Sequence, residues 1–299
     1  MILNGTGLVR FVPRSSASAV FIGQPVDASV DVGLAVRHGE DVRVELFSGS
    51  SVLAAGTATG KFDVIDRILS PLSVNEVGTI RCIGLYRYLH ALQYKQHAAE
   101  VKMDIPTIPT VFLKPNTALG DPWPAPTILP KLTQETDTGD YESELAIVIG
   151  KTAKNVSEAN AMDYVLGYTA ANDVSNRDSQ LSQSQWCFSK GFDGACPIGP
   201  VLVSKELVPD PSKLTLRGLK NSTVLQDCGI NDLIFSVPKI IKFLSQSTTL
   251  LPGTVILTGT PAGVGMGRTP KETLRAGDEF SVEILPHIGT LVNVFENEV

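Results

Sequence analysis

Two glutamates separated by one residue, Glu142 and Glu144, open the stretch YESELAIVIG (141–150). Residues two apart in a β-strand point to the same face, so this spacing places the two carboxylates side by side. Neighbouring carboxylates repel each other, and at the mouth of an apolar strand they are costly unless a cation lies between them. The pair indicates either a metal site or the solvated start of a strand, and by itself it favours neither.

A third carboxylate follows the next predicted strand. Residues 157–164 predict a short helix, and VLGYTAAND (165–173) predicts a strand that ends at Asp173. This strand–helix–strand unit can place its second strand beside the first and bring Asp173 to Glu142 and Glu144. Three carboxylates without a cluster of Cys or His favour a hard divalent cation, Mg²⁺ first, with Mn²⁺ or Ca²⁺ as alternatives.

A candidate general base lies upstream, in the helix-prone segment YRYLHALQYKQHAAE (86–100). His97 and Glu100 are spaced i and i+3, which makes them neighbours on one face of a helix. A carboxylate beside an imidazole orients the ring and raises its basicity, as a general base requires. The alternative is an exposed helix with an incidental His–Glu pair, and the pair alone favours that alternative.

Two later stretches suit an anionic substrate. Lys190 stands in QWCFSKGFDG beside a glycine-rich loop, where its charge can neutralise a carboxylate; without further context a surface lysine is the favoured interpretation. The segment TGTPAGVG (258–265) follows a predicted strand, and its backbone amides with Thr258 or Thr260 can hold a substrate carboxylate. The segment lacks the Gly-Lys-Ser/Thr of a P-loop, and no helix pattern follows it as in a dinucleotide fingerprint.

Composition narrows the function classes. The 299 residues are 43% hydrophobic, enough for a large core in one large domain or in one small and one large domain. A net charge of −6 without a run of Lys or Arg argues against a nucleic-acid partner. No apolar segment is long enough for a secretory signal or a membrane span, so we expect no membrane partner. The four cysteines show no CxxC spacing, which predicts free thiols in a reducing compartment.

The pattern of the chain changes near residue 78. Short apolar or alternating runs broken by Gly, Ser and Asp predict a small N-terminal β-rich domain at 1–78, and the apolar spacing in 62–72 predicts one helix within it. Residues 79–299 contain further strands, a hairpin over LTLRGL and TVLQD, and an amphipathic helix over VPKIIKFLSQ. With 26 Gly and 19 Pro, turns are frequent, which favours a strand-rich fold. The larger domain carries every candidate site residue.

Separated motifs in residues 79–297 together resemble the fumarylacetoacetate hydrolase family. In chain order they are CIGL, YKQHAAE, TVFLKP, YESELAIVIGK, GYTAANDVSNRD, SKGFDGACPIGP, TGTPAGVG, AGDEFSVEI and IGTLVNVF. Each motif is weak alone, but their order is specific. The resemblance implies an α+β, mostly β fold, with a mixed β-roll catalytic domain behind the small N-terminal domain. It also implies a homodimer and a Mg²⁺ or similar ion at Glu142, Glu144 and Asp173.

The resemblance further assigns roles to individual residues. It implies that His97, Glu100 and Lys190 are catalytic. It implies substrate contacts from four more residues, which are Thr260, Gly259, Arg177 and Gln185. In the implied reaction the ion acts as a Lewis acid for a developing enolate, Lys190 adds positive charge, and His97, oriented by Glu100, deprotonates the attacking water.

The implied substrate is a small oxo acid. Hydrolysis of a C–C bond in a 1,3-dicarbonyl 2-oxo acid, of the acylpyruvate or fumarylpyruvate type, is the first expectation. Oxaloacetate decarboxylation or keto–enol tautomerisation on the same metal site is the alternative, because function depends on the site and not on the fold. A family member that binds the metal without catalysis is a further alternative. The expected compartment is the cytoplasm, with the mitochondrion as the alternative.

The segment 86–93 departs from the family pattern, in which GLNY, two residues and HAxE follow one another. An ungapped match selects His90 and places Gln93 where the glutamate is expected. A gapped match selects His97 and Glu100 and continues without a break into TVFLKP. We favour the gapped match because glutamine cannot serve as the carboxylate of the pair. The additional residues either enlarge a lid over the site or come from an incorrect gene model.

Overall fold

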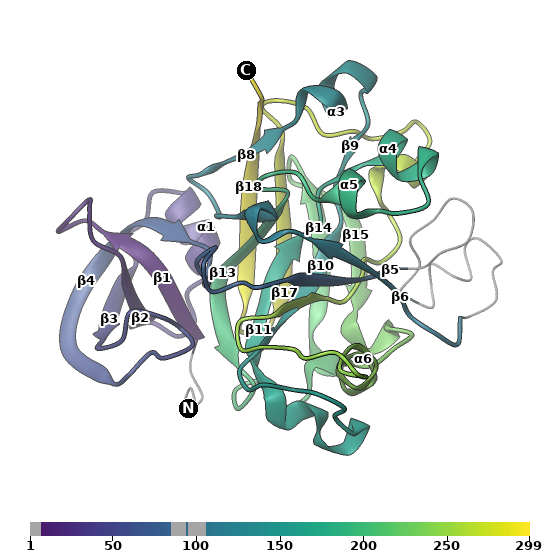
Figure 1. Cartoon of the computed structure of the whole chain (residues 1–299). Coiled ribbons are helices and arrows are strands. Elements are labelled where there is room, and N and C mark those ends of the chain that lie inside the picture. Colours follow the sequence, from purple (N-terminus) through teal and green to yellow (C-terminus); the bar gives the residue numbers. More distant parts are fainter. Residues whose placement is uncertain (1–6, 85–93, 95–105) are drawn as a thin grey trace.

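Two sheets dominate the computed structural model, which describes residues 7–84, 94 and 106–299 (Figure 1). One eleven-stranded sheet runs in the order β2 (Phe21–Pro25), β3 (Arg43–Phe47), β4 (Ala58–Leu69), β1 (Gly7–Pro13), β13 (Cys196–Ser204), β11 (Val165–Asn172), β10 (Ser143–Ile149), β16 (Val255–Leu257), β5 (Ile80–Gly84) and β6 (Thr110–Lys114), with β7 (Leu119–Gly120) beside β13. The second, five-stranded sheet runs in the order β15 (Thr223–Gly229), β14 (Thr215–Lys220), β17 (Glu279–Leu285), β18 (Gly289–Asn297) and β8 (Pro126–Leu129). A third, minor pair joins β9 (Gly139–Asp140) to β12 (Ser175–Asn176).

The helices are short and lie around the sheets (Figure 1). They are α1 (Val32–Arg37), α3 (Lys131–Thr136), α4 (Arg177–Ser182), α5 (Cys187–Lys190) and α6 (Val237–Leu244), with 3₁₀ turns η1 (Asn116–Ala118), η2 (Glu158–Tyr164), η3 (Pro211–Lys213), η4 (Ile230–Asp232) and η5 (Gly265–Gly267). None of the helices that the structure describes is long and apolar enough to cross a membrane. The predicted α+β, mostly β fold is confirmed, as are the predicted hairpin (β14–β15) and the amphipathic helix (α6).

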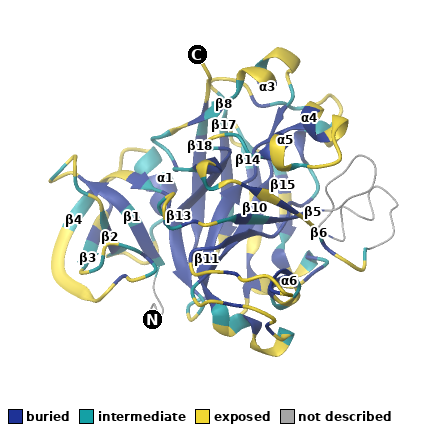
Figure 2. Ribbon diagram, in the orientation of Figure 1, coloured by how far each residue is buried: buried dark blue, intermediate teal, exposed yellow. Residues whose placement is uncertain are grey.

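The central strands β10 and β11 are buried along their whole length, as the dark ribbons of Figure 2 show. Alternate residues of β10 contribute to two different cores: Leu145 and Ile147 belong to one cluster, and Ala146 and Val148 belong to the other. The two strands pair antiparallel, with Ser143 opposite Asn172. The predicted strand–helix–strand unit is therefore correct. Its register places Glu142, just before β10, beside Asp173, just after β11.

The helix predicted over 62–72 is wrong. Residues 58–69 form the strand β4, which pairs with β1 on one side and β3 on the other. The apolar spacing was misleading because the pairing with β1 slips by one residue, so that Val12 faces Arg67 while Pro13 faces Ile65. A β-bulge of this kind lets Ile65 and Ile68 both face the core although they are three residues apart.

The N-terminal strands β1–β4 and helix α1 lie to one side of the molecule (Figure 1). Strand β1 pairs antiparallel with β13, with Gly7 opposite Val203, so these strands continue the large sheet. Asp31 caps α1 by accepting from Leu34 N and also accepts from the Thr290 hydroxyl of β18 at 2.7 Å. The N-terminal part is therefore joined to the rest by a strand pairing and by a partly buried hydrogen bond. The domain boundary at 78/79 stays a prediction.

Candidate metal centre and substrate site

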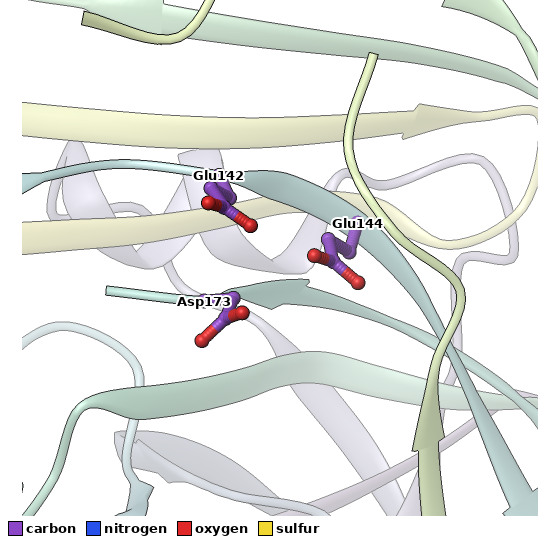
Figure 3. A group of neighbouring side chains, drawn as sticks. All are labelled: Glu142, Glu144 and Asp173. Atoms are coloured by element: carbon purple, nitrogen blue, oxygen red, sulfur yellow. The ribbon is translucent and has the colours of Figure 1, made fainter. Parts of the chain in front are cut away.

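The three predicted carboxylates meet at the ends of β10 and β11 and face a common space (Figure 3). Each of Glu142, Glu144 and Asp173 offers one oxygen, and these oxygens all lie within 4.8 Å of one another. All three residues are buried, with at most 2% of their surface exposed. The Glu pair is therefore not the solvated start of a strand, and the buried cluster could hold a divalent ion.

Backbone contacts at the strand ends fix this geometry. The Asp173 amide donates to the Glu142 carbonyl at 2.9 Å, and the Glu142 amide donates to Asn172 Oδ1 at 3.1 Å. The amide of Asn172 in turn donates to Asn293 Oδ1 of β18, at 3.1 Å. Because these buried groups satisfy one another across two sheets, the positions of Glu142 and Asp173 are set before any ligand binds.

Two buried lysines hold Asp173. Lys190 Nζ lies 2.6 Å from Asp173 Oδ2, 2.9 Å from Glu142 Oε1 and 2.8 Å from the Ser175 hydroxyl. Lys114 Nζ donates to Asp173 Oδ1 at 2.5 Å and to the Ala195 carbonyl at 2.6 Å. Burial alone would lower the pKa of Lys114, but the charge of Asp173 raises it above its ordinary value. Lys190 is therefore a buried site residue and not a surface lysine.

The role of Lys114 was not predicted, although its motif TVFLKP carried part of the family resemblance. The available signal was a single lysine at the end of an apolar strand, where burial is costly without a carboxylate partner. That partner is Asp173, which is distant in sequence and comes beside Lys114 only through the sheet order.

Arg177 follows β12 and lies behind Glu142. Its Nε donates to Asp140 Oδ2 at 2.7 Å, and its Nη1 donates to Glu142 Oε1 and, at 2.9 Å, to Gln180 Oε1. Burial lowers the pKa of Arg177, but Asp140 and Glu142 outweigh that effect and raise it. The guanidinium is thus fixed in place by two carboxylates, while a substrate contact from Arg177 stays a prediction.

Glu144 differs from the other two carboxylates in its charge environment. Among the residues that the structure describes, no Lys or Arg forms an ion pair with it, and its one hydrogen bond comes from Gly259 N at 2.6 Å. Burial, followed by the charges of Asp173 and Glu142, raises the pKa of Glu144. The pKa of Glu142 is lowered instead: burial opposes the shift, but Lys190 and Arg177 outweigh it. A divalent ion bound by the three oxygens would supply the missing positive charge at Glu144, and hard oxygen donors suit such an ion.

The raised pKa of Glu144 predicts how the stability of the ion-free protein changes with pH. Its pKa in the folded, ion-free protein lies above the ordinary 4.5, so folding favours the protonated form. We expect the ion-free protein to lose stability as the pH rises above 4.5 through the raised pKa. Added Mg²⁺ should reverse the trend, because it binds the ionised form. Thermal unfolding across pH in EDTA and in Mg²⁺ measures both slopes, and Glu144→Gln is the matched control that should remove this contribution.

The predicted glycine-rich turn closes the site beside Glu144. Gly259, at φ +91°, adopts a backbone conformation that few other residues tolerate, and its amide holds Glu144. Thr260 is buried, and its hydroxyl accepts from Gln226 Nε2 at 2.8 Å. Asp140 fastens the far end of the turn by accepting from Gly265 N at 2.8 Å and Met266 N at 2.9 Å. Asp140 and Gln226 were not predicted, because their polar neighbours are remote in the sequence.

The remaining predicted site residues are Gln185, His97 and Glu100. Gln185 is exposed in the turn before α5, and no contact between it and the triad occurs in the described part of the chain. His97 and Glu100 lie outside the described residues. So do His90 and Gln93, and the choice between the two histidines stays a prediction.

Known proteins are similar to this chain in sequence and in fold. The family model of the fumarylacetoacetate (FAA) hydrolase C-terminal region matches residues 88–296. Caffeoylpyruvate hydrolase of Neonothopanus nambi is 44% identical over 295 residues, covering 97% of this chain and 93% of the relative. A mitochondrial oxaloacetate tautomerase of Xenopus laevis is 38% identical over 260 residues, covering 84% of this chain and 77% of the relative.

A solved structure agrees over almost the whole length. The crystal structure of 2-hydroxyhepta-2,4-diene-1,7-dioate isomerase from Mycobacterium marinum superposes with a TM-score of 0.77 at 32% identity, covering 98% of this chain and 99% of that one. The matched region contains the whole carboxylate cluster and the two lysines that hold it. The chain is a member of the fumarylacetoacetate hydrolase family.

Proposed function

We propose that this protein is a metal-dependent hydrolase that cleaves a C–C bond in a 1,3-dicarbonyl 2-oxo acid of the acylpyruvate type. The observation that carries the proposal is the buried triad of Glu142, Glu144 and Asp173, in which no Lys or Arg of the described residues forms an ion pair with Glu144. The identity of 44% with a caffeoylpyruvate hydrolase over nearly the full length of both chains supports an acylpyruvate substrate. The proposed ion is Mg²⁺, with Mn²⁺ or Ca²⁺ as alternatives, since all three prefer oxygen ligands.

When bound at the triad, the ion would supply Lewis-acid stabilisation of the negative charge that develops as the C–C bond breaks. The chain's own cations add to this. Lys190 Nζ is held at the same centre by Asp173 and Glu142, so its charge is already oriented before a substrate arrives. Because the surrounding residues are buried, water screens these charges little.

The remaining step requires a base. We assign the role of this base to His97, with Glu100 orienting its imidazole. The imidazole would take a proton from the water that attacks the distal carbonyl. Thr260, Gly259, Arg177 and Gln185 are the proposed substrate contacts. Thr260 and Gly259 lie in the turn that touches Glu144, which supports their assignment.

Keto–enol tautomerisation or decarboxylation of oxaloacetate is the second candidate function. The likeness to an oxaloacetate tautomerase supports it. The same buried charges would stabilise an enolate without an attacking water, so this reaction does not depend on a base that activates water. A metal-binding protein without catalysis is the third alternative, and the segment 86–93 is its motivation.

One assay separates the three functions. The purified protein with Mg²⁺ is offered acetylpyruvate, fumarylpyruvate and oxaloacetate, and the ultraviolet absorbance of the enol is followed together with product analysis. We expect hydrolysis of at least one of the two acylpyruvates into two acids. Turnover of oxaloacetate alone would support the second function, and no turnover of any substrate would support the third.

The assembly and compartment are part of the same proposal. We propose a homodimer, supported by the resemblance to the family, and light scattering of the purified chain measures its mass. We propose the cytoplasm as the compartment. The name of the Xenopus laevis relative supports a mitochondrial compartment as the alternative.

A further inference from the structure

We propose that Gln226 is a positioning residue that makes the Thr260 hydroxyl a hydrogen-bond donor toward the substrate. The inference rests on the proposed function, since it assumes that Thr260 contacts an oxo acid. Gln226 lies on β15, in the second sheet, and only 1% of its surface is exposed. Its side chain reaches across to the first sheet, where it contacts the strand that carries the metal ligands.

The orientation of the Gln226 amide is fixed by its partners. Its Oε1 accepts from Ser143 N at 3.0 Å, and a backbone N–H can only donate. Its Nε2 donates to the Pro261 carbonyl at 2.9 Å, and a carbonyl can only accept. Reversing the amide would place its nitrogen against the Ser143 N–H and its oxygen against the Pro261 carbonyl. Only one orientation is therefore compatible with both contacts.

This orientation determines what Thr260 can do. The second hydrogen of Gln226 Nε2 is donated to Thr260 Oγ1 at 2.8 Å, so the threonine oxygen is the acceptor in that bond. In the described part of the chain, the hydrogen of the Thr260 hydroxyl has no acceptor of its own. It therefore remains available for an anionic oxygen, and the carboxylate or enolate oxygen of an oxo acid is such an acceptor.

Gln226 also joins the two parts of the site. Ser143, whose amide it accepts from, lies between Glu142 and Glu144 in the chain, while Thr260 directly follows the residue whose amide holds Glu144. One side chain thus connects the metal-binding strand to the glycine-rich turn. The neighbouring backbone is closely packed around it, because a Cβ at Gly218 would come within 2.8 Å of Gln226 Oε1.

Gln226→Glu tests the donor assignment with little change in shape. The new side chain still accepts from Ser143 N. Its second oxygen carries at most one hydrogen, which the Pro261 carbonyl takes, so this oxygen can only accept from the Thr260 hydroxyl. We measure by calorimetry the affinity for oxalate, a non-reacting oxo-acid analogue, in saturating Mg²⁺. Thr260→Val should weaken oxalate by about tenfold or more, as expected for one hydrogen bond to a charged group. Gln226→Glu should weaken it by a similar factor.

The double variant distinguishes positioning from general loosening. If Gln226 acts through Thr260, adding Thr260→Val to Gln226→Glu should weaken oxalate by less than about twofold further. Thr260→Ser, which keeps the hydroxyl, should bind nearly as well as the wild type only when Gln226 is present. The proposal is wrong if the losses of oxalate affinity in the two single variants multiply in the double variant. It is also wrong if Thr260→Val leaves the oxalate affinity unchanged.

Tyr141→Phe is the matched control. It removes a hydrogen bond from the Tyr141 hydroxyl to the Gly263 carbonyl of the same turn, at 3.0 Å, without touching Thr260. Its effect should multiply with that of Thr260→Val, and equal coupling in this control would show that any loosening of the turn suffices, against the proposal. If Gln226→Glu does not fold by circular dichroism, Gln226→Met takes its place in the cycle. If the wild-type protein shows no turnover but the effects of the two substitutions on oxalate affinity are coupled, only the proposed function is contradicted. If the wild-type protein is active but the two effects are independent, only this inference is contradicted.

Discussion

Asp173→Ala and Glu144→Ala should both abolish divalent-ion dependence and reduce turnover by at least about 100-fold, because each removes a proposed ligand of the ion. The stability of the ion-free protein should separate the two positions. Asp173 is the shared partner of Lys114 and Lys190, both fully buried, so its removal leaves Lys114 without its carboxylate and Lys190 with Glu142 alone. We expect the free energy of unfolding to fall by about 3–5 kcal/mol.

Glu144 has the opposite electrostatic environment, since burial and two neighbouring carboxylates oppose its ionisation. Glu144→Gln keeps the size of the side chain and removes the like-charge repulsion. It should leave the stability of the ion-free protein unchanged or raise it, while removing the stabilisation that Mg²⁺ gives to the wild type. Urea unfolding with EDTA and with Mg²⁺ measures both quantities. Equal destabilisation by Asp173→Ala and Glu144→Gln in EDTA would show that the described ion pairs do not determine the charge balance.

His97→Ala should reduce acylpyruvate hydrolysis by roughly 10²–10⁴-fold, the range for the loss of a general base. The neighbouring variant His90→Ala should change it by only a few-fold, because the gapped match leaves His90 outside the catalytic pair. Steady-state rates of both variants on the best acylpyruvate give the comparison. Glu100→Gln serves as a third variant and should lie between them, since it removes the carboxylate that orients the ring and keeps the base.

The reverse order of the two histidines would contradict the gapped match and would make Gln93 the neighbour of the base. The oxaloacetate reaction supplies an internal control. Because decarboxylation of oxaloacetate needs a stabilised enolate but no attacking water, His97→Ala should impair it less than it impairs hydrolysis. Equal losses in both reactions would argue that His97 contributes to the binding of the oxo acid and not to the activation of water.

The carboxylate triad could be predicted because the residue types and the strand periodicity indicate the same residues. Glu142 and Glu144 share a face because a strand has a period of two, and Asp173 ends the next apolar run along the chain. Antiparallel pairing of these consecutive strands then suffices to bring the three together, in agreement with the register of β10 on β11. This part of the site depends on neighbouring segments alone, and it could therefore be predicted.

The partners of the triad could not be predicted in the same way. Lys114, Asp140 and Gln226 reach the site from strands whose place in the sheets is set by the whole fold. A polar residue in an apolar run signals that some partner exists, but it does not say which one. The wrong helix over 62–72 has a related cause, since a one-residue bulge gives a strand the apolar spacing of a helix.

We propose that a divalent ion at Glu142, Glu144 and Asp173 is required for this protein to turn over an oxo acid. The most direct measurement is the rate of acetylpyruvate cleavage by one preparation before chelation, after removal of metal with EDTA, and after Mg²⁺ is restored. We expect the rate to fall to background in EDTA and to recover with Mg²⁺ in the wild type, but not in Asp173→Ala. An undiminished rate in EDTA, or recovery in Asp173→Ala, would contradict the claim.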